Sequence, residues 1–261
     1  MGKLIFFDID GTLVSEDGYF PESAKKALSM AKANGHSLFI STGRTFSNVD
    51  MFLQELGFDG YLCGCGTEII YKGKSLMYHT LPKDICYEMA MLVRDCNVSP
   101  IYERSDIMFY DPEIRIIPFL DDMLKLYERK KAKVIPWEET KESFWFDKFV
   151  VWYDENSDID KFYKGIEPYF YYIDRGTGFI ELVPNGYSKG KAILSLLDYL
   201  NADVKDTIAI GDSLNDLQMM EVVHTSIAMG DGEKLHPYVS YVTKKLKDDG
   251  LYHALNHFNI I

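Results

Sequence analysis

Leu4-Ile5-Phe6-Phe7-Asp8-Ile9-Asp10-Gly11-Thr12 decides the fold of this chain, because an apolar run typical of a buried strand ends there in two carboxylates. Side chains alternate along an extended chain, so we expect Asp8 and Asp10 to point the same way, roughly 6 to 7 Å apart. At that distance they repel by about 2.5 kcal/mol at an effective dielectric constant of about 20. A divalent cation between them, or a proton on one, would remove the conflict. The alternative is an Asp-rich turn that closes a buried strand.

The glycine after the second carboxylate has a predicted role of its own. Gly11 has no Cβ and lets the backbone turn sharply. We expect its amide to face an anion held by the same cation.

The composition limits the class of protein. The chain has 261 residues and is 47% hydrophobic, enough for one large core or two modest ones. We find no apolar run of the roughly 20 residues that span a bilayer and no secretory signal pattern, so we expect a cytoplasmic protein. The formal charge of −12 argues against nucleic acid as a partner, because a phosphate-backbone binder needs a basic surface. Oligomeric state is left open, a monomer included.

The four cysteines do not have the spacing of a structural zinc site. Cys63 and Cys65 lie one residue apart, and neither Cys86 nor Cys96 completes a C-x-x-C pair. Two neighbouring thiols could bind a soft metal, but they are more often plain apolar residues. A cytoplasmic setting also disfavours disulfides.

Strand and helix patterns alternate at both ends of the chain, which predicts a parallel sheet covered by helices. In the first part we predict strands at 3–8, 37–41 and 60–63 and helices at 22–34 and 46–56. After Ser188 we predict helices at 189–200 and 214–222 and strands at 207–211, 225–229 and 239–243.

The middle of the chain has a different residue pattern. Aromatic and β-branched runs such as 149–153 and 169–173 alternate with amphipathic stretches, which predicts an α+β unit with an antiparallel sheet. We therefore predict an α/β protein whose doubly wound, Rossmann-like parallel-sheet core, residues 1–81 and 187–261, is interrupted by an inserted α+β cap domain at 82–186.

Three further polar segments lie at predicted strand ends or helix starts, where open α/β sheets bind ligands. Ser41-Thr42-Gly43-Arg44 offers a hydroxyl and a backbone amide for an anion, although helix capping explains it equally well. Ser188-Lys189-Gly190-Lys191 puts cations where the helix dipole disfavours them, which suggests an anionic partner; solvated surface is the alternative.

The last of these segments is Gly211-Asp212-Ser213-Leu214-Asn215-Asp216. If a helix begins near Ser213, Asp212 and Asp216 could face the same opening. Asp216 could instead serve only as a first-turn acid that satisfies the helix dipole, whereas Asp212, at the end of a strand, has no such explanation.

Taken in order, the four segments resemble the four motifs of the haloacid dehalogenase (HAD) superfamily of phosphotransferases. The long insertion between the second and third motifs resembles the Cof-type branch, subfamily IIB. Ala228-Met229-Gly230 and Asp249-Gly250-Leu251 are further matches. The resemblance covers the core, and the cap matches only in position and coarse pattern. Cys63-Gly64-Cys65-Gly66 departs from the Asn-Gly-Ala-like stretch common in that branch.

The resemblance implies roles for particular residues. Asp8 would be the nucleophile that forms an aspartyl-phosphate, and Asp10 the general acid and base. Mg²⁺ would be held by Asp8, the backbone carbonyl of Asp10 and Asp212, with support from Asp216. The residues that would hold the phosphoryl group are Thr42, Gly43, Lys189 and Asn215.

These roles imply a Mg²⁺-dependent phosphatase that hydrolyses a small phosphomonoester. Sugar phosphates, phosphorylated cofactors and nucleotides are all candidate substrates. Related ion-pumping ATPases have Thr at the position of Asp10, so Asp10 favours a phosphatase or a phosphomutase over a pump. A phosphomutase is the nearest alternative, and a non-catalytic ligand-binding protein on the same fold is the alternative from another class.

Overall fold

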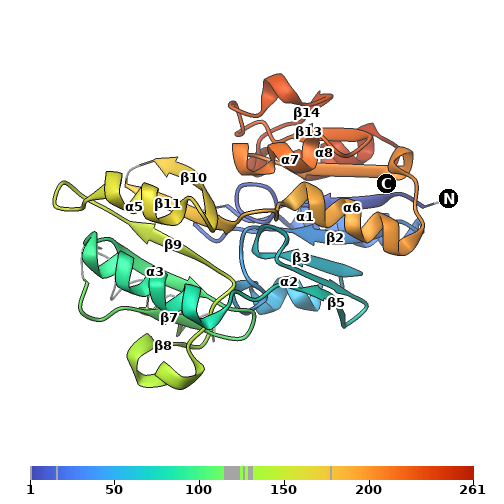
Figure 1. Cartoon of the computed structure of the whole chain (residues 1–261). Helices are drawn as coiled ribbons and strands as arrows, with labels where there is room; N and C mark the ends of the chain where they lie inside the picture. The colour runs from blue at the N-terminus through green and yellow to red at the C-terminus, as the bar shows by residue number, and fades with distance from the viewer. Residues whose placement is uncertain (1, 16, 115–123, 126, 129–131, 177) are drawn as a thin grey trace. The chain divides into compact units, whose positions relative to one another are not determined.

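The computed structural model divides into two compact units (Figure 1). The first unit comprises Met1–Gly43, Phe52–Met77 and Ser188–Ile261, and the second comprises Arg44–Met51 and Tyr78–Tyr187. This division differs from the predicted boundaries at 44–51, 78–81 and 187. The residues that the structure describes are 2–15, 17–114, 124–125, 127–128, 132–176 and 178–261.

An eight-stranded sheet forms the first unit, in the order β14-β13-β12-β1-β2-β3-β4-β5. Its strands are β1 (Leu4–Phe7), β2 (Ser37–Ser41), β3 (Gly60–Cys63), β4 (Glu68–Tyr71), β5 (Lys74–Tyr78), β12 (Thr207–Gly211), β13 (Thr225–Ala228) and β14 (Tyr241–Val242). The strands from β14 to β3 pair in parallel, which confirms the predicted α/β core, and β4 pairs antiparallel with β3. Leu4 of the central strand lies opposite both Thr207 and Ser37.

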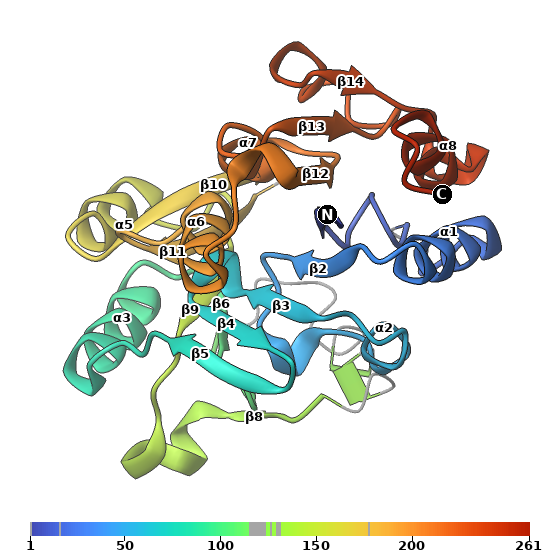
Figure 2. The same ribbon diagram turned by 90° about the vertical axis from the view of Figure 1, so that its right-hand side faces the viewer.

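Helices lie on both sides of this sheet. They are α1 (Glu22–Ala33), α2 (Met51–Glu55), α6 (Lys189–Leu200), α7 (Leu217–Met220) and α8 (Gly250–His257). Phe6 and Phe39 point from the sheet into a core shared with Leu196 of α6, while α1 lies on the opposite side and contacts α8 (Figure 2). Within the described ranges, no helix is long and apolar enough to cross a membrane.

Several predicted elements differ from those observed. The helix expected at 46–56 is a 3₁₀ turn, η1 (Phe46–Asn48), followed by the separate α2, because Val49 adopts an extended conformation. The helix expected at 214–222 is a 3₁₀ turn, η5 (Leu214–Asp216), that leads into the four-residue α7. The antiparallel pair β4 and β5 was not predicted, and the strand expected at 239–243 is limited to β14.

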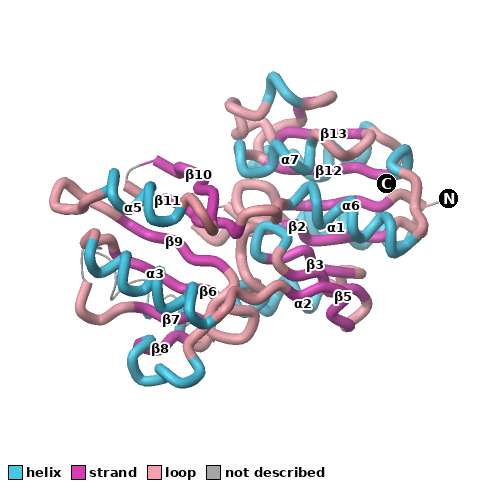
Figure 3. The backbone as a smooth tube through the Cα atoms, in the orientation of Figure 1, coloured by secondary structure: helices cyan, strands magenta, loops and turns pink. Residues whose placement is uncertain are grey.

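The second unit contains a six-stranded sheet in the order β10-β11-β9-β6-β7-β8 (Figure 3). Its elements are α3 (Lys83–Asp95), β6 (Ser99–Glu103), β7 (Met108–Tyr110), β8 (Val134–Pro136), η3 (Trp137–Ser143), β9 (Lys148–Trp152), α5 (Ile159–Ile166), β10 (Phe170–Gly176) and β11 (Phe179–Pro184). The two aromatic runs form β9 and β10, as predicted. The antiparallel prediction is wrong at one edge, where β7 and β8 pair in parallel.

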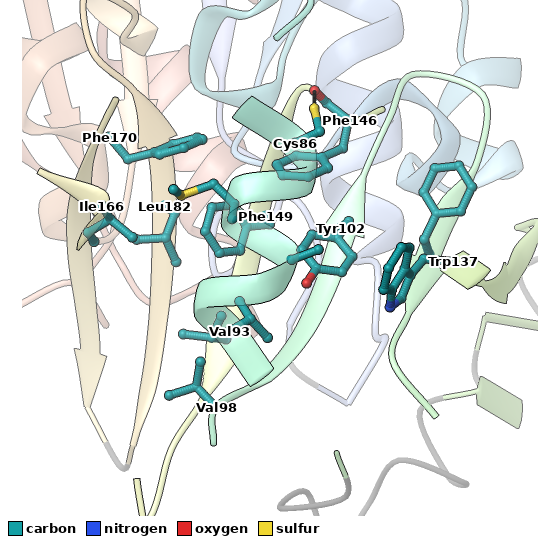
Figure 4. Close-up of a cluster of buried hydrophobic side chains, with 14 of the residues drawn as sticks. Cys86, Val93, Val98, Tyr102, Trp137, Phe146, Phe149, Ile166, Phe170 and Leu182 are labelled. Atoms are coloured by element: carbon teal, nitrogen blue, oxygen red, sulfur yellow. Dashed lines mark hydrogen bonds between the residues drawn. The ribbon is translucent and has the colours of Figure 1, made fainter. Parts of the chain in front are cut away.

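Aromatic side chains fill the core between this sheet and its helices (Figure 4). Tyr102 stacks on Phe146 with ring centroids 4.8 Å apart, and Phe149 meets Phe170 edge to face at 5.1 Å. Such pairs add to the free energy gained from burying apolar surface. The aromatic runs of this unit are therefore in large part packing residues.

The opposite face of the same sheet carries a buried group of charges. Lys148 Nζ donates to Glu103 Oε2 at 2.9 Å and to Glu181 Oε1 at 2.7 Å. Burial raises the pKa of Glu103 above its usual value, and the nearby Lys148 opposes the rise without cancelling it. The two carboxylates share the Lys148 ammonium, and the charge of Arg44 also acts on Glu103, yet burial outweighs both cations.

We expect Glu103→Gln to become more stable relative to wild type as the pH rises above 4.5. The raised pKa means that folded Glu103 binds its proton more tightly than the unfolded chain does, so wild-type stability falls as the pH rises through that pKa. The glutamine variant does not undergo this titration. Melting temperatures measured from pH 4 to pH 8 test the expectation, with exposed Glu155→Gln as the control; parallel curves for Glu103→Gln and wild type would contradict it.

Candidate active site

Neighbouring parallel strands bring the predicted site residues to one edge of the first sheet. β1 pairs with β12 on one side and with β2 on the other, and all three run in the same direction. Asp8 follows β1, Thr42 follows β2 and Asp212 follows β12. This edge is where ligands bind in open α/β sheets.

Lys189 lies at the centre of the site and bonds two of the predicted acids. Its Nζ donates to Asp8 Oδ1 at 2.7 Å and to Asp216 Oδ1 at 2.6 Å. All three residues are buried, with exposed fractions of 1% for Lys189, 3% for Asp8 and 0% for Asp216. The solvated-surface interpretation of Lys189 is therefore wrong.

Ser188 explains how a lysine is held at a helix start. Its backbone is extended and its hydroxyl accepts a hydrogen bond from the Lys191 amide, so Ser188 caps α6 and Lys189 is the first helical residue. The cation stays at the disfavoured end of the helix because two carboxylates contact it.

The two carboxylate oxygens of Asp216 accept hydrogen bonds from different groups. Oδ2 accepts from the backbone amides of Asp212 at 3.0 Å and Ser213 at 3.2 Å, and Oδ1 accepts from Lys189. Both interpretations of this residue therefore hold in part: Asp216 satisfies the amides at the start of η5 and also contributes its charge to the site.

Three carboxylates form a group that could hold a cation. One oxygen from each of Asp8, Asp212 and Asp216 lies within 4.8 Å of the others. When all three are ionised beside the Lys189 ammonium, the group has two uncompensated negative charges. The side chain of Asp10 is exposed and lies outside this group, but its charge acts on Asp8. β1 ends at Phe7, before both acids, and the separation of roughly 6 to 7 Å expected from strand alternation stays a prediction.

The electrostatics of the site reflect this excess of acids. Burial first, then the neighbouring charge of Asp216, raise the pKa of Asp8 to about 7, against the opposing effect of Lys189. Burial lowers the pKa of Lys189, but Asp216 and Asp8 outweigh it, and the net effect is a raised pKa that keeps the ammonium charged. A further positive charge beside Asp8 would favour its ionised form.

Gly11 differs from its predicted role. Its amide donates to the Val14 carbonyl at 2.8 Å inside a tight turn, so it does not face an anion. Gly11 is nevertheless required by space, because a Cβ at this position would lie 2.3 Å from Asp212 Oδ2. The glycine lets the Asp212 carboxylate approach the turn that follows Asp8.

The predicted phosphate-holding residues have mixed environments. The Thr42 amide donates to the Leu62 carbonyl at 2.9 Å, so this amide does not serve the predicted anion contact. Asn215 is held by Ser213, whose hydroxyl donates to Asn215 Oδ1 at 2.6 Å. The contacts of Thr42, Gly43 and Asn215 with a phosphoryl group stay predictions.

Two features of the site were not anticipated from the sequence. One is a cavity of about 620 Å³ that adjoins Gly11 and Asp212 and is also lined by Asp231 and Lys245.

The other is a 3₁₀ turn, η2 (Gly64–Gly66), which packs against α6; its Cys65 amide donates to the Thr42 carbonyl at 3.0 Å. The Cys-Gly-Cys-Gly sequence indicated an unusual turn, but it did not indicate that this turn would contact Thr42 and α6. Cys63 and Cys65 are free thiols, and both are buried.

Comparison with known proteins identifies the family of this chain. The sequence profile of the family described as haloacid dehalogenase-like hydrolase matches residues 5–255. The chain is 28% identical to the "Putative phosphatase YkrA" of Bacillus subtilis (strain 168), over 99% of this chain and 98% of that protein. It is 27% identical to the HMP-PP phosphatase of Escherichia coli O8 (strain IAI1), over 88% of this chain and 85% of that protein.

Solved structures show the same fold. The HAD subclass IIB sugar phosphatase BT4131 superposes with a TM-score of 0.81 at 24% identity, over 99% of this chain and all of that one. Both the fold and the family resemblance predicted from the sequence are confirmed. The chain belongs to the haloacid dehalogenase-like hydrolases.

Proposed function

We propose that this hydrolase is a Mg²⁺-dependent phosphatase that acts on a small phosphomonoester through an aspartyl-phosphate on Asp8. The observation that carries the proposal is the buried contact of Lys189 with both Asp8 and Asp216 at the shared edge of the parallel strands. A buried lysine beside a buried carboxylate fits a site that receives a phosphoryl group, whose charge needs a fixed cation.

The residues present fit a magnesium ion. Carboxylate oxygens are the ligands that Mg²⁺ prefers, and a divalent cation would neutralise the two excess negative charges of Asp8, Asp212, Asp216 and Lys189. Asp8, Asp212 and the Asp10 backbone carbonyl would hold the ion, and Asp216 would support it. When bound, the ion would neutralise charge on the phosphoryl oxygens.

Asp8 and Asp10 divide the chemistry between them. In the first step a carboxylate oxygen of Asp8 attacks phosphorus, the bond from phosphorus to the leaving oxygen breaks, and Asp10 donates a proton to that oxygen. In the second step Asp10 takes a proton from water, which attacks phosphorus and releases inorganic phosphate and the Asp8 carboxylate. Lys189, Thr42, Gly43 and Asn215 would hold the phosphoryl oxygens.

Asp10 is suited to this role by its environment. Its side chain is exposed, whereas Asp8 is buried, and the charge of Asp10 still reaches Asp8 and contributes to its raised pKa. An exposed acid beside a buried nucleophile can exchange protons with a leaving group and with water. This difference in burial assigns distinct tasks to two carboxylates that are only one residue apart.

The proposed substrate class is supported by the substrates named for two similar proteins and by the net charge of the chain. The two similar proteins with stated substrates act on HMP-PP and on sugar phosphates. We propose a small phosphorylated metabolite for this chain, with the core, residues 1–81 and 187–261, carrying the chemistry and the cap, residues 82–186, selecting the leaving group. The net charge of −12 disfavours nucleic acid.

Hydrolysis of p-nitrophenyl phosphate in the presence of Mg²⁺ tests the proposal. We expect saturable release of p-nitrophenol and inorganic phosphate in equal amounts. A panel of phosphorylated metabolites ranked by kcat/KM then identifies the leaving group. Transfer of phosphate to a second sugar hydroxyl would identify a mutase instead, and binding without turnover would identify a non-catalytic protein.

Asp10→Ala is expected to slow hydrolysis of an alkyl phosphate by ~10² to 10⁴-fold, the usual contribution of positioned proton transfer. The first step should depend less on Asp10 with p-nitrophenyl phosphate, because its leaving group needs little protonation. Single-turnover phosphorylation of the variant with both substrates at saturating Mg²⁺ separates this step from dephosphorylation. Equal fractional losses on the two substrates would remove the acid role from Asp10.

A further inference from the structure

The η2 turn contacts one of the proposed phosphate-holding segments through the backbone. The Cys65 amide donates to the Thr42 carbonyl at 3.0 Å, and the Thr42 amide donates to the Leu62 carbonyl at 2.9 Å. β3 and its turn therefore bond both the backbone amide and the backbone carbonyl of Thr42. The position of Thr42 follows the position of the turn.

The same turn contacts the start of α6. A Cβ on Gly66 would lie 2.4 Å from the Ser188 carbonyl oxygen and 2.9 Å from its carbon, so the two backbones touch there. The Ser188 carbonyl accepts the first helical hydrogen bond from Ala192, and Lys189 is the next residue. Any displacement of Ser188 is passed on to Lys189.

The turn has an unusual backbone for its residue types. Cys65 has φ 54° and ψ 33°, a left-handed conformation that side chains other than Asn, Asp and Gly rarely adopt, and it is 2% exposed. Gly66 follows with φ 95°. The exposed turn between β4 and β5 also contains a left-handed residue, Lys72, but Cys65 differs from it because it is buried and held by neighbouring segments. Strained backbone persists where its surroundings fix it.

We infer that the η2 turn is a positioning element that sets the separation of Thr42 and Lys189, and that Gly66 and Cys65 are its positioning residues. The inference rests on the proposed function, because it is the transferred phosphoryl group that these two residues would hold. Neither Cys65 nor Gly66 is assigned a contact with the reacting atoms. Gly66 acts through the backbone of Ser188 and Cys65 through the backbone of Thr42, and the Cys65 side chain also lies near enough to Lys189 to interact with its charge.

Gly66→Ala compared with Gly73→Ala tests the inference. Both changes add a Cβ at a positive φ, but a Cβ on Gly73, in the turn between β4 and β5, meets no atom within 4 Å. We expect Gly66→Ala to lower kcat/KM by about 10 to 100-fold, the scale of a small misplacement of binding groups. Gly73→Ala should stay within about 2-fold of wild type, because it adds strain without moving Ser188. Equal activities of the two variants would overturn the inference.

Binding of inorganic phosphate gives a readout that does not require turnover. Calorimetric titration in the presence of Mg²⁺ should show weaker binding to Gly66→Ala than to wild type or Gly73→Ala. Wild-type protein that binds phosphate without hydrolysing any phosphate ester would refute the proposed function alone. Wild-type affinity in Gly66→Ala would refute the positioning role alone.

Substitutions at Cys65 keep the test decisive if Gly66→Ala does not fold. Asparagine tolerates the left-handed conformation and valine does not, so Cys65→Val should weaken phosphate binding while Cys65→Asn retains it. Lys72, exposed with φ 46°, provides the matched control: Lys72→Val adds the same strain away from the site. Equal losses in Cys65→Asn and Cys65→Val would assign the effect to the thiol and overturn the inference.

Discussion

Asp8→Asn is expected to lower kcat by at least ~10⁴-fold, the scale on which removal of a covalent nucleophile acts. The amide is a poor nucleophile and a weaker metal ligand than the carboxylate it replaces. The loss should appear as complete absence of a phosphoenzyme when the variant is mixed with substrate and quenched in acid. Mass spectrometry of the quenched wild-type protein should place the phosphoryl group on Asp8.

The variant should fold, which separates loss of chemistry from loss of structure. Asparagine is nearly isosteric with aspartate, and its carbonyl oxygen can still accept the hydrogen bond that Lys189 donates to Asp8 at 2.7 Å. Burial disfavours the charged form of Asp8, so the neutral amide removes a cost. We expect a melting temperature equal to or above that of wild type. A phosphoenzyme on any residue other than Asp8 would overturn the assignment.

Removal of divalent cations is expected to abolish turnover. Without a cation, one oxygen from each of Asp8, Asp212 and Asp216 lies within 4.8 Å of the others, and the Lys189 ammonium bonds Asp8 and Asp216. Burial together with Asp216 raises the pKa of Asp8 to about 7. A protonated Asp8 is not a nucleophile, and a dianionic phosphate ester would be repelled by the remaining charges. Dialysis against EDTA followed by an assay in metal-free buffer measures the effect.

The control is restoration by excess Mg²⁺, which distinguishes chelation from denaturation. Asp212→Asn should raise the Mg²⁺ concentration needed for half-maximal activity, because Asp212 would contribute a charged ligand. Exposed Asp160→Asn changes the net charge equally, lies outside both the group of three acids and the cavity beside Asp212, and should leave that concentration unchanged. Full activity in a rigorously metal-free preparation would exclude the proposed mechanism.

The parts of the site predicted from sequence are those governed by local rules. Apolar strands that end in acids placed Asp8 and Asp212 at the same sheet edge, since parallel neighbours share a direction. A helix was predicted from residue 189, and cations at its disfavoured end suggested an anionic partner; the structure shows Lys189 as the first helical residue, held by two carboxylates. These inferences needed only strand period, helix polarity and charge.

The parts that were missed depend on contacts between distant segments. The Gly11 amide donates to the Val14 carbonyl in a turn whose hydrogen bonds cannot be predicted from the residue types. The pair β4 and β5 depends on a left-handed Lys72, a conformation that lysine does not signal. The parallel pairing of β7 with β8 and the contact of Gly66 with Ser188 join segments far apart in the chain.

Every residue proposed to react, to hold the metal or to hold phosphate lies in the first unit: Asp8, Asp10, Thr42, Gly43, Lys189, Asp212, Asn215 and Asp216. All of them also lie outside the continuous segment 82–186. A recombination event that exchanged 82–186 for the equivalent segment of a relative would inherit the reacting groups unchanged. If the cap selects the leaving group as proposed, such chimaeras change the preferred leaving group, because substitutions within 82–186 leave every proposed reacting residue in place.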